Sequence, residues 1–180
     1  MKLRKGSQDA TGLTFGIVAS KFNKFVTSRL LTECVKALTK AGVTDEAIEV
    51  VRVPGAFEIP LVARQLARSG RFDAVICLGA VIRGDTPHFE YISTEVRRGI
   101  LQASMDSNIP VIFGVLTTDT VAQAIERADP EQLNRGADAA KTAIEMVNVM
   151  RLLKKEGSGE APQPATPSRR AGRSAARPKR

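Results

Sequence analysis

The sequence predicts one α/β domain, in which a parallel sheet carries helices on both faces. Segments typical of strands and segments typical of helices alternate along residues 13–155. The most apolar strand segment, Ala74–Leu78, is an unbroken run with two β-branched residues, which indicates a strand buried on both faces. The chain has 180 residues and 43% hydrophobic content, enough for a single domain with its own core.

Four strands and five helices are expected, with boundaries set by glycine and proline. Gly42 and Gly70 follow apolar-periodic segments and are predicted helix stops, whereas Pro60 is predicted to open a helix. In chain order the expected elements are strand Thr14–Ser20, helix Phe25–Ala41, strand Ala47–Val53, helix Pro60–Ser69, strand Ala74–Leu78, helix Pro87–Ser107, strand Val111–Leu116, helix Val121–Ala128 and helix Arg135–Lys155.

The two ends of the chain differ from the domain between them. Residues 1–12 are expected to form a flexible arm, and residues 156–180 a disordered basic tail. The tail holds six basic and two acidic residues, half of the net charge of +8, and almost no large apolar ones. We favour a solvated appendage; nucleic-acid contact is the less favoured alternative, because the tail has no aromatic residue to stack on bases.

Composition argues against several classes of protein. No apolar run approaches the length of a membrane span, and no secretory segment follows the basic N-terminus. Cys34 and Cys77 lack C-x-x-C spacing, and we interpret them as small core residues in a reducing compartment, which predicts a cytoplasmic protein. With one histidine and no cysteine cluster, no metal site is expected.

The stretch Gly79–Tyr91, G-A-V-I-R-G-D-T-P-H-F-E-Y, is predicted to be a glycine-rich turn followed by a helix start. Thr86 is expected to cap that helix and Pro87 to take its first position. Free N–H groups and the positive dipole end make such a place an anion site. The only histidine, His88, falls in the first turn, where the dipole disfavours the imidazolium and favours a base-competent ring.

A nucleotide-binding P-loop is the main competing interpretation of this turn. Gly79 and Gly84 have the required spacing, and Thr86 fits the last position, but Asp85 stands where the phosphate-binding lysine should be. A carboxylate there would repel a triphosphate. The residues therefore argue against ATP or GTP binding.

Three further polar clusters stand at predicted strand exits: Lys21-Phe22-Asn23, Pro54–Pro60 and Thr117–Thr120. Phe22 either belongs to the core or covers a planar ligand. Glu58 either favours a helix N-terminus or accepts hydrogen bonds from ligand hydroxyls. Parallel sheets bind ligands at the carboxyl ends of their strands, so these clusters are expected to share one site.

Four ordered motifs, K-F-N at 21–23, P-G-A-F-E-I-P at 54–60, the 79–91 stretch and F-G-V-L-T at 113–117, closely resemble the 6,7-dimethyl-8-ribityllumazine synthase family. The resemblance covers residues 13–153. It implies a three-layer α/β/α sandwich with a four-stranded parallel flavodoxin-like sheet. It also implies a transferase without a cofactor that condenses 5-amino-6-(D-ribitylamino)uracil with 3,4-dihydroxy-2-butanone 4-phosphate, releasing phosphate and water in the penultimate step of riboflavin biosynthesis.

The resemblance also implies roles for individual residues. His88 is expected to carry protons, and Arg127 to pair with phosphate. The expected substrate-binding residues are Phe22, Ala56, Phe57, Glu58, Ala80, Val81, Ile82, Asp85, Thr86, Phe113 and Arg127, of which Phe113 and Arg127 are expected to come from a neighbouring subunit of a pentamer. Arg135 stands where the family usually has lysine. The family includes single pentamers, paired pentamers and sixty-subunit shells.

The sequence argues against two other functions. A phosphoacceptor signalling domain would need an aspartate at the end of the third strand, where Leu78-Gly79-Ala80 stands. A shell-forming scaffold without activity is the remaining alternative, and the presence of His88 and Arg127 argues against it.

Overall fold

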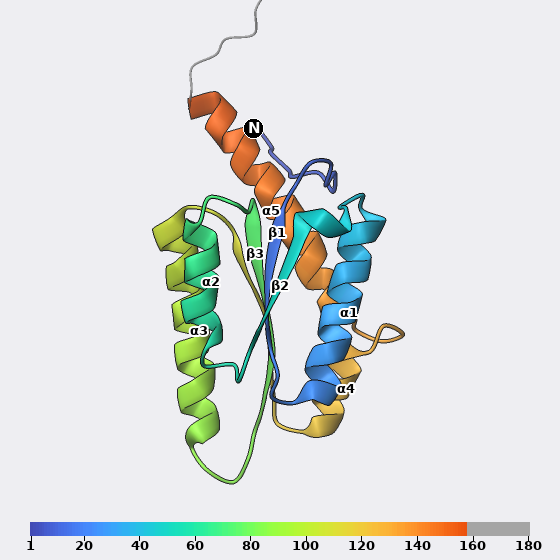
Figure 1. Cartoon of the computed structure of the whole chain (residues 1–180), viewed down its shortest axis with the longest axis vertical. Helices are drawn as coiled ribbons and strands as arrows, with labels where there is room; N and C mark the ends of the chain where they lie inside the picture. Colours follow the sequence, from blue (N-terminus) through green and yellow to red (C-terminus); the bar gives the residue numbers. More distant parts are fainter. Residues whose placement is uncertain (158–180) are drawn as a thin grey trace, which may run out of the picture.

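The computed structural model describes residues 1–157 and confirms the α/β class. Four parallel strands form one sheet in the order β2-β1-β3-β4, which lies between two layers of helices (Figure 1). The elements are β1 (Phe15–Ser20), α1 (Lys24–Lys40), a short 3-10 helix η1 (Asp45–Ala47), β2 (Ile48–Val53), α2 (Ile59–Arg68), β3 (Ala74–Ile82), α3 (His88–Ser107), β4 (Val111–Thr118), α4 (Val121–Ala128) and α5 (Arg135–Gly157).

The core is divided by the sheet into two clusters. One face packs against α1, α4 and α5, and the other against α2 and α3 (Figure 1). Alternate residues of β3 enter opposite clusters: Ile76 and Leu78 lie in the first, Val75 and Cys77 in the second. All four are fully buried, as expected for a central parallel strand.

Helix ends follow the predicted signals closely. Gly42 and Gly70 adopt φ values of 97° and 73°, a left-handed region that glycine enters without a Cβ clash. Pro60 lies in the first turn of α2. The expected ends of α1 and α2 are therefore confirmed to within a residue.

The third strand is longer than the sequence predicted. Gly79–Ile82, expected to be a turn, continues β3 and pairs residue by residue with Val115–Thr118 of β4. A Cβ on Gly79 would approach Ile59 Cδ1 to 3.0 Å and Val115 Cγ1 to 3.3 Å. The glycine permits close packing of α2 on the sheet rather than a turn.

The start of α3 also corrects a prediction. Thr86 makes no capping bond; Pro87 occupies the N-cap position, and no side chain caps the helix. The backbone N–H of Glu90 donates to the Pro87 carbonyl oxygen at 3.1 Å, so the first helical turn begins with that carbonyl. Proline suits this place because its φ is already near the helical value.

The N-terminal residues lie against α5. Asn148 Nδ2 donates to the carbonyl oxygens of Ser7 and Asp9, at 3.1 and 2.8 Å, and Ala10 is fully buried. A Cβ on Gly6 would lie 2.2 Å from the Glu145 carbonyl oxygen, so the chain approaches the helix closely there.

At the other end, α5 runs to Gly157 and includes the first two residues of the predicted tail. Residues 158–180, the remainder of the predicted disordered basic tail, lie outside the described residues. Within residues 1–157, no helix has the length and apolar character to cross a membrane.

Candidate functional site

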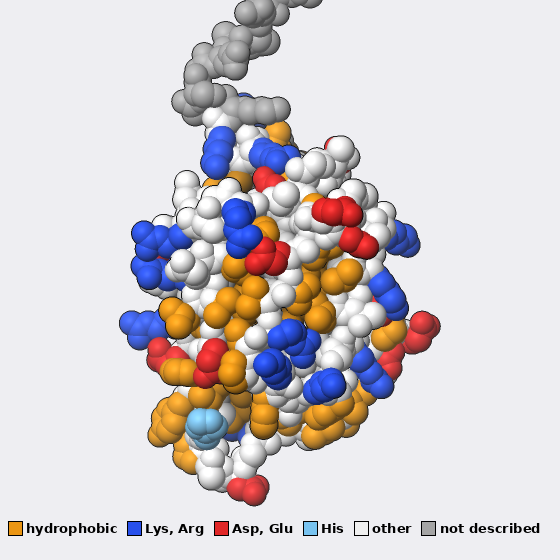
Figure 2. All heavy atoms as spheres, viewed as in Figure 1, with side chains coloured by type: hydrophobic (Ala, Val, Ile, Leu, Met, Phe, Trp, Pro, Cys, Tyr) orange, Lys and Arg blue, Asp and Glu red, His pale blue; other side chains and the backbone are white. Residues whose placement is uncertain are grey.

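A cavity of about 670 Å³ opens at the carboxyl ends of β1, β2 and β3, beside the first turns of α2 and α3. In Figure 2 hydrophobic side chains gather at this end of the molecule, around the histidine. The residues that line the cavity are Phe22, Asn23, Gly55, Ala56, Phe57, Glu58, Ala80, Val81, Ile82, Gly84, Thr86, His88, Phe89 and Ile92. The structure thus brings together most of the residues that the sequence singled out.

Two aromatic side chains stand at the cavity with large parts of their rings in solvent. Phe22 is 69% exposed and Phe57 is 57% exposed. The backbone N–H of Phe22 donates to the Pro54 carbonyl oxygen at 3.0 Å, which ties the exit of β1 to that of β2. Phe22 is therefore not a core residue, and the interpretation of it as a cover for a planar ligand is the one that remains.

Asn23 is a lining residue that the sequence analysis did not single out for a role. It is the N-cap residue of α1 with φ 54° and ψ 46°, and its side chain makes no capping bond. Instead Nδ2 donates to the Ala80 carbonyl oxygen at 3.0 Å. Asparagine tolerates this left-handed conformation better than most residues, and here it links the exits of β1 and β3 beneath the cavity.

Glu58 takes part in the turn that precedes α2. Its Oε2 accepts a hydrogen bond from the Gly55 backbone N–H at 2.8 Å, and it makes no capping bond to the helix. The bond holds the carboxylate at the cavity wall. The turn also leaves the buried Ala56 among the lining residues.

The loop from β3 to α3 forms the opposite end of the cavity. Gly84 and Thr86 line it, as does His88, whereas Asp85 is not among the lining residues. The His88 side chain is exposed and belongs to the first residue of α3. An imidazole beside a helix N-terminus is the arrangement that the sequence predicted, apart from the capping residue, and the role of His88 as a proton carrier stays a prediction.

Phe113 and Arg127 lie in a different cavity. This one, of about 570 Å³, runs along the edge strand β4 and is also lined by residues of α4 and α5. Phe113 is 44% exposed, and Arg127 Nη1 donates to the Gln123 carbonyl oxygen at 3.1 Å. Within one subunit, then, Phe113 and Arg127 do not join the cavity that contains His88, and Arg135 lines the same edge cavity.

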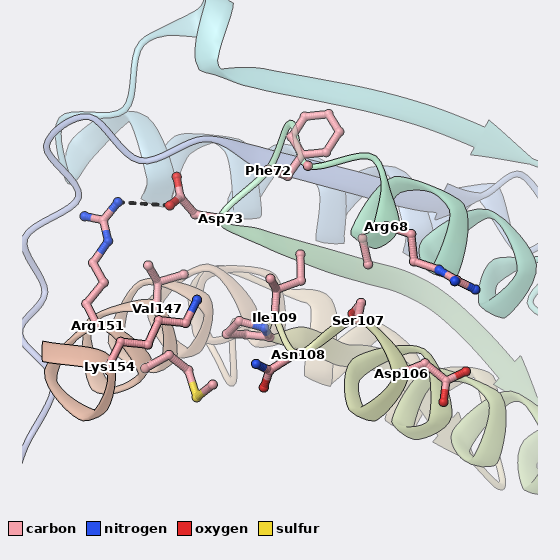
Figure 3. Close-up of a pocket in the computed structure, with 14 residues that line it drawn as sticks. Arg68, Phe72, Asp73, Asp106, Ser107, Asn108, Ile109, Val147, Arg151 and Lys154 are labelled. Carbon is pink, nitrogen blue, oxygen red and sulfur yellow. Dashed lines mark hydrogen bonds and ion pairs between the residues drawn. The ribbon is translucent and has the colours of Figure 1, made fainter. Parts of the chain in front are cut away.

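A third cavity, of about 500 Å³, opens at the amino ends of the strands (Figure 3). Its acidic groups are paired with arginines. Arg151 Nη2 lies 2.9 Å from Asp73 Oδ1, and Arg64 Nε lies 3.3 Å from Asp106 Oδ2. In Figure 3 the Arg68 side chain points away from the Arg151–Asp73 pair. Ligands of parallel α/β sheets bind at the opposite end of the strands, so this cavity is not the candidate active site.

Both cysteines are buried and unpaired. Burial raises the pKa of the Cys34 thiol to about 12 and raises that of Cys77 further, because desolvation disfavours the thiolate. The reactive species is the thiolate, so neither residue is a candidate nucleophile. This agrees with their interpretation as core residues.

Comparison with known proteins identifies the family. Residues 12–151 match the model of the 6,7-dimethyl-8-ribityllumazine synthase family. A curated protein named 6,7-dimethyl-8-ribityllumazine synthase, from Syntrophus aciditrophicus (strain SB), is 60% identical over 149 residues, which cover 83% of this chain and 97% of that protein.

Proposed function

The chain belongs to the 6,7-dimethyl-8-ribityllumazine synthase family, and we propose from this premise how its own residues divide the work of the reaction. Membership confirms the predicted transferase and its place in riboflavin biosynthesis. The observation that carries the proposal is the cavity in which aromatic rings, strand-end backbone and an imidazole face one space. The two substrates are a ribityl-bearing pyrimidine and a phosphorylated butanone.

The part of the cavity at the ends of β1 and β2 is proposed to hold the pyrimidine. Phe22 offers an exposed ring for stacking on the uracil. Ala80–Ile82 would hydrogen-bond the uracil edge through their backbone groups. Residues 56–58 would line the ribityl chain, with the Glu58 carboxylate accepting from its hydroxyls.

The part of the cavity at the loop before α3 is proposed to hold the phosphorylated butanone. Backbone N–H groups of Asp85 and Thr86 would face the phosphate, next to the positive end of α3. His88 would move protons while the ring amine attacks the ketone, phosphate leaves and the ribityl nitrogen closes the second ring. Holding both substrates in one cavity supplies the proximity that such a condensation needs.

The position of Phe113 and Arg127 supports a shared active site. Both lie at the β4 edge, in a cavity separate from that of His88. If the β4 edge of one subunit faces the His88 cavity of the next, Phe113 closes the pocket and Arg127 pairs with phosphate. A head-to-tail contact of this kind forms a ring when its rotation closes, and a pentamer is the ring we propose.

Exposed apolar side chains support subunit contact over the α2–α3 layer. Leu61, Leu101 and Met105 are each more than 60% exposed. Leu61 belongs to α2, and Leu101 and Met105 belong to α3, so large apolar side chains are exposed on both helices of one layer, as is common at interfaces. We also propose a cytoplasmic location, in keeping with the free, buried Cys34 and Cys77.

Two measurements test these proposals. Purified protein mixed with both substrates should form the lumazine, followed by its absorbance and fluorescence; absence of product with folded protein would favour the inactive scaffold. The native mass separates five, ten and sixty subunits, and a monomer at assay concentration would contradict a shared site.

A further inference from the structure

Arg83 connects three elements around the loop that leads from β3 to α3. Its backbone N–H donates to the Thr118 carbonyl oxygen at 2.9 Å, one residue beyond the last β3–β4 pair. Its Nε donates to Asp119 Oδ1 at 2.7 Å, and its Nη1 donates to Glu90 Oε1 in the first turn of α3. The guanidinium carbon lies 4.2 Å from the centroid of the Phe89 ring.

These contacts link the residues that flank the loop of residues 84–87. Arg83 immediately precedes the loop, and its partners Phe89 and Glu90 lie in the helical turn that follows it. The loop itself includes Gly84, whose surroundings are so open that a Cβ would meet nothing within 4 Å. Packing around Gly84 therefore does little to fix the loop, whereas the Arg83 contacts link its two ends.

The charges around Arg83 argue against a role as a phosphate ligand. Its hydrogen bonds to Asp119 and Glu90 raise the pKa of the guanidinium, and the bond from Arg83 lowers the pKa of the Glu90 carboxyl. One positive charge thus stands between two negative ones. The two carboxylates outweigh the charge of the guanidinium and disfavour a phosphate there, and Arg83 is not among the residues that line the cavity.

The ring that Arg83 covers does line the cavity, because Phe89 is part of its wall together with His88 and Thr86. Arg83 therefore touches the site only through its neighbours. A guanidinium suits this place because it donates in two directions and stacks on a ring at once, which an ammonium does less well.

We propose that Arg83 is a positioning residue: by binding Glu90, Asp119 and Phe89, it sets the geometry of the phosphate loop and of His88. This rests on the proposed function, in which the phosphorylated butanone binds at that loop. The pyrimidine end of the cavity is built by other residues, so its affinity should not depend on Arg83.

The first test uses Arg83→Gln in the full-length enzyme. We expect kcat/KM for the butanone phosphate to fall by about 10- to 100-fold, since small misplacement of reacting groups has effects of that size. The inhibition constant of inorganic phosphate should rise, while KM for the pyrimidine stays within about twofold. An unchanged kcat/KM and phosphate inhibition constant would overturn the proposal.

The second test uses Glu90→Gln combined with Asp119→Asn, which removes both charged partners and leaves Arg83 in place. A positioning role predicts that this double variant loses about as much kcat/KM for the butanone phosphate as Arg83→Gln does. Adding Arg83→Gln to the double variant should then lower kcat/KM little further. A phosphate-binding role predicts the opposite sign: the released guanidinium would lower the inhibition constant of inorganic phosphate. That result would overturn the proposal.

Arg71→Gln is the matched control. Arg71 also lies over a ring, 4.7 Å from the centroid of Phe72, and also binds a carboxylate, that of Glu49, but it precedes β3 at the other end of the sheet. The Arg71→Gln variant should leave all kinetic constants unchanged. Equal losses of kcat/KM in both arginine variants would contradict a specific role for Arg83. A wild-type enzyme that forms no lumazine would instead refute the proposed function.

Discussion

Replacement of Asn23 tests how the site is built into the fold. In Asn23→Ala the bond from Nδ2 to the Ala80 carbonyl oxygen is lost, and Ala80 is only 3% exposed. Leaving that carbonyl unpaired should cost about 1–2 kcal/mol. Alanine in the left-handed conformation observed at φ 54° costs roughly 1 kcal/mol more. The expected total is about 2–3 kcal/mol.

Asn23→Gly separates these two contributions. Glycine also loses the hydrogen bond but adopts positive φ without strain, so it should cost about 1 kcal/mol less than alanine. No capping bond is lost in either variant, because the Asn23 side chain makes none. The difference between the variants therefore reports the backbone conformation alone.

Thermal unfolding followed by circular dichroism, at one protein concentration, measures both effects. A difference of about 1 kcal/mol corresponds to roughly 2–4 °C for a domain of this size. Asn23→Gly should melt below wild type, and Asn23→Ala lower still. Equal melting temperatures for the two variants would refute the argument from backbone conformation, and a glycine variant as stable as wild type would refute the contribution of the hydrogen bond.

Three further results are expected. His88→Ala should lower turnover by about 10²- to 10⁴-fold with little change in melting temperature, and unchanged turnover in steady-state kinetics would remove His88 from the mechanism. Arg127→Ala should raise KM for the phosphorylated butanone far more than KM for the pyrimidine; equal increases would show that its partner is not the phosphate. Cys34 and Cys77 should not react with a thiol reagent such as DTNB until the protein unfolds, and rapid labelling of the native protein would contradict their burial.

The sequence predicted the helices better than the extent of the strands. Local signals ended α1 and α2 where the structure ends them, because Gly42 and Gly70 supply the positive φ that those ends require. Gly79 misled the prediction of β3. A glycine after an apolar run is typical of a turn, but its partner Val115 is distant in sequence, and local pattern does not report such pairing.

The sequence indicated which residues gather at the candidate site better than how distant segments meet there. Phe22 and Glu58 stood out because each follows a strand, and strand exits converge in a parallel sheet. The separation of Arg127 from His88 within one chain depends on β4 being the edge strand. No local pattern shows this, and the expectation of it came from the family resemblance alone.

Two contacts around the site also escaped the sequence analysis. The link from Asn23 to Ala80 and that from Arg83 to Asp119 join residues 57 and 36 positions apart. The only local signal for the Arg83 cluster was Glu90, in the first turn of α3.

The shared active site can be measured directly by combining two damaged subunits. His88→Ala and Arg127→Ala chains are co-expressed with different affinity tags, and assemblies that contain both are isolated by two successive purifications. In a ring, a site that pairs His88 of one chain with Arg127 of its neighbour is intact in about one case in four. We predict recovery of about a quarter of wild-type turnover, and mixed assemblies no more active than the two parent variants would contradict the shared site.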